Sequence, residues 1–274
     1  MLTRIIAKTG ESLPVIGLGT WKTFDVGATD RERRPLVEVL RRFSAAGGRV
    51  IDSSPMYDRA EGVAGDLREH VPAAFLATKV WTSGREHGIE QMKHSMDLLR
   101  TRRIDLMQVH NLVDWRTHLP TLRDWKRSGH VRYIGVTHYQ TGAFPQLASI
   151  MESEDIDFVQ LPLSITVPNA EERLLPLAID RRIAVLVNRP FEAGVIFRNA
   201  RSRKLPAWAA DFGCASWAEI FLRWIVSHPA VTCVIPATRN PSHMSENLRA
   251  GEGRVLTAKE REDLRKRVLA AVGS

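Results

Sequence analysis

The sequence lacks the features of secreted, membrane-spanning and metal-knuckle proteins. Only two cysteines occur in 274 residues, Cys214 and Cys233, and their spacing suits neither a disulfide framework nor a zinc knuckle. No apolar run approaches the roughly 18 residues that cross a bilayer, and residues 1–17 contain no apolar signal-peptide core. We therefore expect a protein of the reducing cytoplasm that enters no membrane and needs no metal.

Acidic residues are outnumbered by basic ones, 31 against 39, which gives a formal net charge of +8. Such a balance suits either nucleic acid or an anionic small molecule. Short arginine clusters occur at residues 31–34 and 100–103, but no aromatic side chains interleave with a basic stripe. We expect no nucleic-acid binding and instead an anionic small ligand on a basic surface.

Short apolar segments recur along the chain and predict eight strands. They are Val15–Leu18, Arg49–Ser53, Phe75–Val80, Ile104–His110, Val131–Thr137, Phe158–Leu163, Ile183–Val187 and Thr232–Ile235. Most are continuous apolar runs rather than alternating ones, which is typical of a parallel sheet covered by helices.

Amphipathic segments separate most of these strands. In residues 33–48, Leu36, Val37, Leu40 and Phe43 share one helical face, and Gly47 suits the C-cap. Further helices are predicted at 89–102, 119–128, 142–152, 170–181, 216–228 and 257–272, the last with Thr257 as its N-cap. Eight strands that alternate with helices predict an α/β fold, a (β/α)8 TIM barrel, with residues 1–274 as a single domain.

Polar side chains gather where the predicted strands end. In a barrel of this kind the C-terminal ends of the strands form one mouth, and chemistry takes place there. The side chains at these ends are Asp52, Lys79, His110, Thr137, His138, Gln160, Asn188, Arg189, Thr238 and Arg239, and Tyr57 follows Asp52 by five residues.

Four of these side chains have complementary chemistry. A carboxylate such as Asp52 holds a neighbouring lysine, Lys79, in its cationic form. A cationic lysine lowers the pKa of a nearby phenol such as Tyr57, whose ordinary value is about 10. His110 can orient a substrate or relay a proton. We expect Tyr57 to donate a proton near neutral pH.

The segments IGLGTW, RVIDSSPMYDRAE, FLATKVW, RIDLMQVHN, RYIGVTH and CVIPATRNPSHMSENL follow one another along nearly the whole chain. In this order the sequence resembles the aldo-keto reductase family. The resemblance implies a monomeric barrel that reduces aldehydes and ketones with NADPH. It assigns catalysis to Asp52, Tyr57, Lys79 and His110, with Tyr57 as general acid.

The resemblance also implies the binding residues. The cofactor-binding set is Gly19, Thr20, Trp21, Asp52, Thr137, His138, Gln160, Asn188, Arg189, Thr238, Arg239, His243, Glu246 and Asn247. The substrate-binding set is Trp21, Met56, Tyr57, Trp81 and His110, with Trp115 as a further candidate. Gln160 matches the family residue that hydrogen-bonds the carboxamide of the nicotinamide. Arg239 is expected to bind the 2′-phosphate of NADPH.

Four residues depart from the family pattern. Thr137-His138 replaces the usual Ser-Asn pair, Asn188 stands where a tyrosine commonly stacks on nicotinamide, and Ala237 replaces the familiar lysine. These changes affect the expected cofactor affinity more than the reaction type. The chain is also short after Asn247, from which we expect an open pocket and broad specificity.

Three other functions are alternatives to a carbonyl reductase. A metal-dependent barrel hydrolase needs several His and Asp ligands at strand ends, and the first strand here is followed by Gly19, Thr20 and Trp21 instead. A Schiff-base aldolase needs a neutral lysine, which Asp52 opposes. A catalytically weak, cofactor-binding regulatory protein of the same family remains an alternative.

Overall fold

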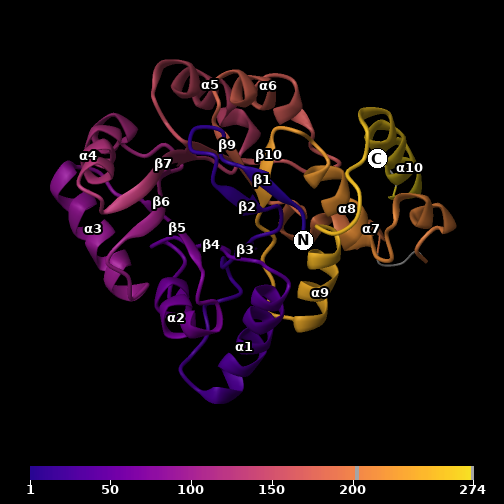
Figure 1. Ribbon diagram of the computed structural model, residues 1–274, viewed down its shortest axis with the longest axis horizontal. Coiled ribbons are helices and arrows are strands. Elements are labelled where there is room, and N and C mark those ends of the chain that lie inside the picture. The colour runs from indigo at the N-terminus through magenta and orange to yellow at the C-terminus, as the bar shows by residue number, and fades with distance from the viewer. Residues whose placement is uncertain (201–203, 273–274) are drawn as a thin grey trace.

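The computed structural model describes residues 1–200 and 204–272 and has eight parallel strands arranged as a barrel (Figure 1). The strands are β3 (Leu18–Gly19), β4 (Val50–Asp52), β5 (Phe75–Val80), β6 (Ile104–His110), β7 (Val131–Thr137), β8 (Phe158–Pro162), β9 (Ala184–Asn188) and β10 (Val231–Val234). Each strand pairs in parallel with the next along the chain. The predicted (β/α)8 barrel is therefore confirmed.

Residues 15–19 close the barrel against the last strand. Parallel bridges join Ile16 to Val234 and Gly19 to Ala237, and the Gly19 amide donates to the Pro236 carbonyl at 3.1 Å. The backbones lie so close here that a Cβ on Gly19 would stand 2.9 Å from the Ile235 carbonyl oxygen. Glycine at this position therefore permits the closure.

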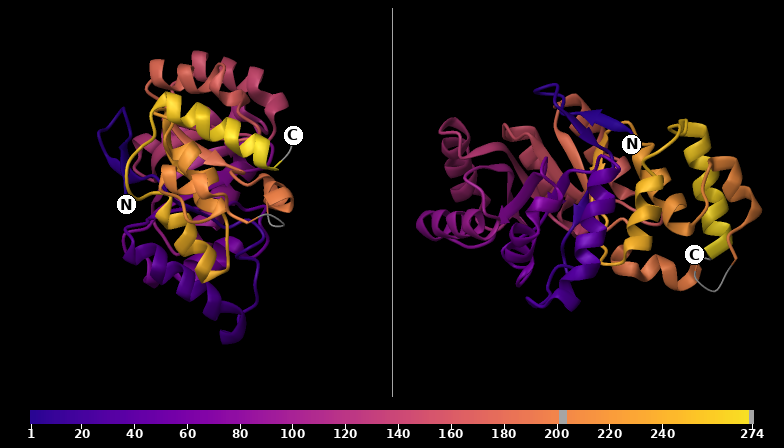
Figure 2. Two further views of the ribbon diagram at one scale, coloured as in Figure 1. Left: turned by 90° about the vertical axis from the view of Figure 1, so that its right-hand side faces the viewer. Right: turned by 60° about the horizontal axis from the view of Figure 1, so that its bottom comes forward.

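Helices surround the sheet, as the views in Figure 2 show. They are α1 (Asp30–Ala45), α2 (Ala60–Asp66), α3 (Arg85–Leu98), α4 (Trp115–Arg127), α5 (Phe144–Ser153), α6 (Leu174–Asp180), α7 (Val195–Ala200), α8 (Trp217–Val226), α9 (Pro241–Arg249) and α10 (Ala258–Val272). Helices α1, α3 and α4 begin three or four residues earlier than predicted. Helix α1, for example, begins after Thr29, whose side chain accepts from the Glu32 amide.

The sequence analysis missed an antiparallel hairpin, β1 (Thr3–Ile5) with β2 (Ser12–Pro14), which crosses one end of the barrel in Figure 1. Ile6 and Leu13 belong to the cluster of side chains that fills the barrel interior. Glu11 in the hairpin turn accepts a hydrogen bond from the Tyr133 hydroxyl at 2.6 Å. The hairpin therefore covers the N-terminal end of the barrel.

Side-chain alternation along the strands places apolar groups low in the barrel and polar groups at its mouth. Successive strand residues face opposite sides, so every second residue points inward. On β5 the inward positions run from Phe75 through Ala77, both in the interior cluster, to Lys79. On β6 they run from Leu106, in the same cluster, to His110. The polar mouth therefore rests on a packed apolar floor.

Candidate active site

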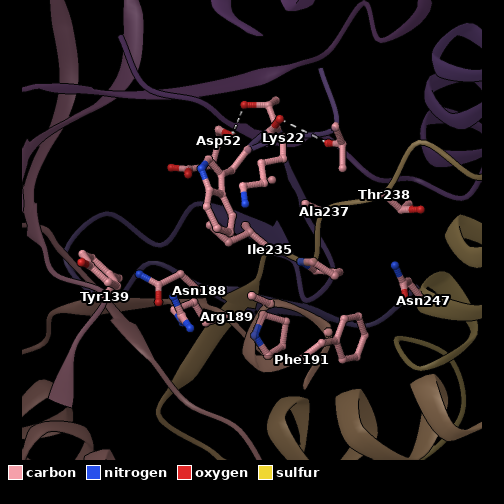
Figure 3. A pocket seen from close by; sticks show the side chains of 18 of the residues that line it. Lys22, Asp52, Tyr139, Asn188, Arg189, Phe191, Ile235, Ala237, Thr238 and Asn247 are labelled. Carbon is pink, nitrogen blue, oxygen red and sulfur yellow. Dashed lines mark hydrogen bonds between the residues drawn. The ribbon is translucent and has the colours of Figure 1, made fainter. Parts of the chain in front are cut away.

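A cavity of about 1160 Å³ opens at the C-terminal ends of the strands (Figure 3). Most of the predicted binding residues line it: Gly19, Thr20, Trp21, Asp52, Met56, Tyr57, Trp81, His110, Thr137, Gln160, Asn188, Arg189, Thr238, His243, Glu246 and Asn247. Its volume exceeds the roughly 300–1,000 Å³ of drug-sized ligand pockets. The cavity has room for a ligand larger than a simple carbonyl compound.

An ion pair between Lys79 and Asp52 lies beneath this cavity. The Lys79 Nζ donates to Asp52 Oδ2 at 2.7 Å and also to the Ser53 carbonyl, and the lysine is fully buried. Burial disfavours the charged amine, but Asp52 and other nearby groups hold the pKa of Lys79 above its usual value. The lysine is therefore a fixed cation, as expected from the sequence.

Tyr57 lies over this cation. It follows β4 in a turn in which its amide donates to the Ser54 carbonyl at 3.0 Å, and Lys79 Nζ lies 5.3 Å from the centre of its ring. Burial raises the pKa of Tyr57 and outweighs the opposing effect of Lys79. The expectation of a lowered phenol pKa was therefore wrong, because it did not include the loss of solvation.

His110 completes the group from the end of β6. Its ring meets Tyr57 edge to face, with ring centres 5.9 Å apart. Burial, and next the Lys79 charge, lowers the pKa of His110 to about 2. The imidazole is therefore neutral at physiological pH.

Ser54 is the hydrogen-bond partner of His110 Nδ1. The Ser54 Oγ lies 2.9 Å from His110 Nδ1 and accepts from the Met56 amide at 3.4 Å. Its own hydrogen is then free to donate to Nδ1. A neutral ring that accepts at Nδ1 carries its proton on Nε2. With Ser54 as the donor, the Nε2–H of His110 can serve a ligand in the cavity.

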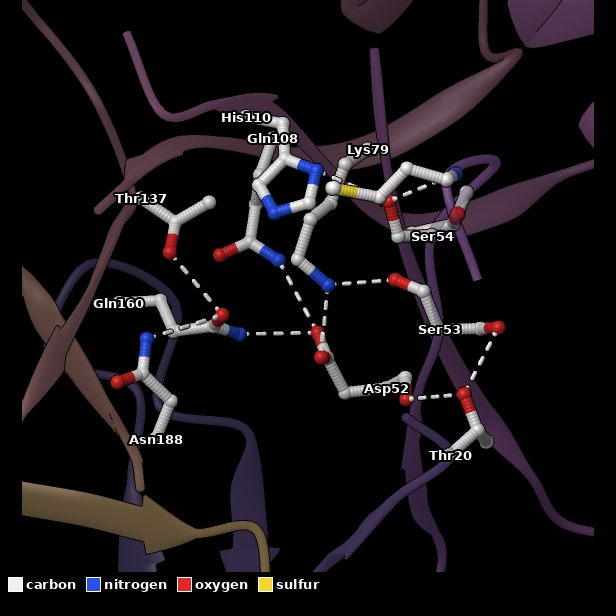
Figure 4. A network of polar contacts seen from close by, with 12 residues as sticks. Thr20, Asp52, Ser53, Ser54, Lys79, Gln108, His110, Thr137, Gln160 and Asn188 are labelled. Atoms are coloured by element: carbon white, nitrogen blue, oxygen red, sulfur yellow. Dashed lines mark hydrogen bonds and ion pairs between the residues drawn. The ribbon is translucent and has the colours of Figure 1, made fainter. Parts of the chain in front are cut away.

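Amide groups surround the other side of Asp52 (Figure 4). Gln160 Nε2 and Gln108 Nε2 donate to Asp52 Oδ1 at 2.9 and 3.3 Å. Thr137 Oγ1 donates to Gln160 Oε1 at 3.0 Å. The sequence analysis did not single out Gln108, although its position two residues before His110 puts both side chains on the inward face of β6.

Some predicted residues do not reach the cavity. The His138 ring accepts from the Gln140 amide at 3.1 Å and stacks on Tyr139, while Arg239 lies exposed outside the cavity lining. Trp115 begins α4 and packs against the helix-side core instead of lining the cavity. The cavity residues that sequence reasoning missed include Lys22, Asn111, Tyr139 and Trp217.

The described residues hold no candidate metal centre or membrane span. Within 1–200 and 204–272, no three His, Cys, Asp or Glu side chains are placed to share a metal ion. None of the helices there is both long enough and apolar enough to cross a membrane.

Known proteins with similar sequences and structures share one family. The sequence profile of the Aldo/keto reductase family matches residues 15–268. The methylglyoxal reductase YeaE of Escherichia coli is 26% identical over 90% of this chain and 89% of its own length. The methylglyoxal reductase DkgA of Salmonella typhimurium is 25% identical over 89% of this chain and 86% of its own length.

Solved structures agree on the fold. An aldo/keto reductase from Klebsiella pneumoniae, crystallised with NADP and acetate, superposes with a TM-score of 0.81 at 23% identity and covers 96% of this chain and 94% of its own. The aldo-keto reductase Tm1743, crystallised with the inhibitor epalrestat, gives a TM-score of 0.79 at 24% identity over 97% and 99% of the two chains. With the family profile matched over most of its length, this chain belongs to the aldo/keto reductase family.

Proposed function

We propose that the protein reduces aldehyde or ketone carbonyls to alcohols, with NADPH as the hydride donor and Tyr57 as the general acid. The observation that carries the proposal is the buried Lys79–Asp52 pair, at 2.7 Å, beside Tyr57 and His110 at a large cavity. As a member of its family the chain is an NADP-dependent oxidoreductase. What remains to be tested is the role of each residue and the substrate.

The cavity residues fit a dinucleotide cofactor. One part of the lining, beside Asp52, is polar and includes an Asn188 Oδ1 that is buried and has no donor among the described residues. The lining extends to helix α9, where His243, Glu246 and Asn247 lie. Arg239 precedes α9 and is exposed, and we propose that its guanidinium binds the 2′-phosphate of NADPH outside the cavity lining. When bound, NADPH supplies the hydride for the reduction.

Tyr57 supplies the proton. Its raised pKa keeps the hydroxyl protonated throughout the physiological range. A carbonyl oxygen that gains negative charge becomes an alkoxide, which is a far stronger base than a phenolate, so proton transfer from Tyr57 is downhill. The fixed Lys79 cation then stabilises the phenolate that remains.

His110 supplies a second hydrogen bond to the same oxygen. With Ser54 as donor to Nδ1, the Nε2–H of His110 is a neutral donor, and it stabilises charge on the carbonyl oxygen as that charge develops. A neutral donor also leaves Tyr57 as the group that gives up a proton, because an imidazolium would compete with it. The pKa of about 2 for His110 therefore separates the roles of the two side chains.

The substrate binds at the aromatic rim. Trp21, Met56 and Trp81 line the cavity and are 39%, 36% and 41% exposed. An apolar rim of this kind suits aliphatic or aromatic aldehydes. The relatives named methylglyoxal reductases add small ketoaldehydes to the compounds to test.

A second candidate function is a catalytically weak, cofactor-binding protein. It is favoured by His138, which lies outside the cavity lining, and by Asn188 at a position where the family commonly stacks an aromatic ring. Such a protein would bind NADPH and leave it unoxidised in the presence of every aldehyde tested.

The test measures NADPH oxidation with a panel of aliphatic, aromatic and keto-aldehydes. Tyr57→Phe preserves shape and removes the proton, so turnover should fall by about 10²–10⁴-fold while NADPH still binds. Tyr139→Phe is the matched control, because it removes a hydroxyl from the same cavity lining without the Lys79–Asp52 pair beneath it. Near-normal turnover in Tyr57→Phe would contradict the assignment, and a wild type inactive on the whole panel would favour the second function.

A further inference from the structure

Asp52 fixes the orientation of the amide groups beside it. Its carboxylate is paired with the Lys79 cation and can only accept hydrogen bonds. Gln160 must therefore present its nitrogen to Asp52 Oδ1, at 2.9 Å, and its oxygen must face the other way. That oxygen accepts from Thr137 Oγ1 at 3.0 Å. The orientation of Gln160 is thus set by charge.

The same reasoning extends to Asn188 at the end of β9. Its Nδ2 lies 3.5 Å from Gln160 Oε1 and 3.4 Å from the His138 carbonyl oxygen. Both neighbours are acceptors, so the nitrogen must face them and Oδ1 must point away, as Figure 4 shows. Asn188 lines the cavity, and its Oδ1 is buried without a donor in the part of the chain that the structure describes.

An acceptor held in this way is a binding feature. Buried polar atoms are rarely left unpaired, and the exceptions often mark functional sites. Gln160 has a second N–H beyond the one given to Asp52. Asn188 and Gln160 therefore offer an acceptor and a donor from adjacent amides, a pattern that matches the amino group and the oxygen of a primary carboxamide.

We propose that Asn188 Oδ1 accepts a hydrogen bond from the carboxamide amino group of the nicotinamide ring and so selects that carboxamide. The inference rests on the proposed function, which brings the nicotinamide to the Tyr57 side of the cavity. Asn188 would then take over the cofactor contact that the resemblance assigned to the His138 position. The His138 ring instead accepts from the Gln140 amide and stacks on Tyr139. The contact from Asn188 also explains a polar side chain where an aromatic one was expected.

Asn111 is the natural comparison. Its Oδ1 is also buried and without a donor among the described residues, and it lines the same cavity directly after His110. No side-chain hydrogen bond to another described residue pins its amide, so Asn111 can rotate to suit a donor or an acceptor. It therefore carries no comparable selectivity and serves as the matched control.

The experiment compares two cofactors that differ only at the amino group. In the 3-acetylpyridine analogue of NADP⁺ a methyl group replaces that amino group and the carbonyl remains. Dissociation constants for both are measured by quenching of tryptophan fluorescence, without any turnover. The wild type should bind the analogue about ten-fold more weakly than NADP⁺, because the analogue leaves Asn188 Oδ1 unpaired.

In Asn188→Leu the ratio of the two dissociation constants, analogue over NADP⁺, should fall to about one, because the variant loses affinity for NADP⁺. Asn188→Ser should give the same result if the leucine variant does not fold, because its shorter side chain withdraws the acceptor. Asn111→Leu should keep the wild-type ratio. A wild-type ratio of one, or a ten-fold ratio that survives in a folded Asn188 variant, overturns the inference. Failure of the wild type to bind either compound would instead refute the proposed function.

Discussion

Replacement of Lys79 by methionine isolates the electrostatic part of the proposed mechanism. Methionine fills much of the same volume and removes a charge 5.3 Å from the centre of the Tyr57 ring. At an effective dielectric constant of about 20, a charge pair at this separation is worth about 3 kcal/mol, or roughly 2 pKa units. If half or all of this stabilisation acts on the transition state, turnover falls about 10- to 100-fold.

The direction of the pH effect also follows from the charge. Removing a nearby cation raises the pKa of Tyr57 further above its already raised value. A general acid works only below its pKa, so the alkaline limb of the pH–rate profile should move to higher pH while the plateau falls. NADPH affinity should change little, because Lys79 is fully buried and does not line the cavity.

The assay follows NADPH oxidation across pH under single-turnover conditions. Removing one partner of a buried ion pair destabilises a protein by about 3–5 kcal/mol, so Asp52→Asn/Lys79→Met, which removes both charges, accompanies the single variant. Lys22→Met is the matched control, since Lys22 lies exposed at the same cavity, where solvent screens its charge. Unchanged turnover and an unchanged alkaline limb in a folded Lys79→Met protein would refute the reasoning.

Three further predictions concern the cofactor, acid stability and packing. Arg239→Ala should weaken NADPH binding about ten-fold and leave NADH binding almost unchanged, by fluorescence titration; equal losses for both would contradict a 2′-phosphate contact. Folding lowers the pKa of His110 to about 2, so the free energy of unfolding of the wild type should fall as pH drops below about 6.5, by up to 1.4 kcal/mol per pH unit. In chemical denaturation, the free energy of unfolding of His110→Gln should depend less steeply on pH. Gly135→Ala should lower the free energy of unfolding by about 1–3 kcal/mol, because its Cβ would stand 2.5 Å from the Phe158 carbonyl oxygen; an unchanged melting temperature would show that the barrel relaxes there.

The sequence alone determined the order and type of the main elements. Apolar runs and helical periodicity are local signals, and they predicted β5, β6 and β7 with the bounds that the structure shows. The hairpin β1–β2 was missed because its strands are three residues long, too short for any period to emerge. The start of α1 was placed late, because its cap, Thr29, lies outside the amphipathic segment.

The sequence also determined which side chains meet at the mouth of the barrel. Asp52, Lys79, His110 and Gln160 converge because parallel strands bring their C-terminal ends together, and this follows from topology without detailed packing. Gln108 could have been found by the same reasoning, since alternation from His110 points it inward.

Only the tertiary structure decided the electrostatics and the hydrogen-bond directions. The pKa of Tyr57 depends on the loss of water around it, which no list of neighbouring residue types contains. The hydrogen bond between the His138 ring and the Gln140 amide, and the direction of Asn188 Oδ1, depend on which partners lie within hydrogen-bond distance after folding. Sequence names the groups at a site, but burial and relative orientation, which set their charge and their direction, exist only once the chain has packed.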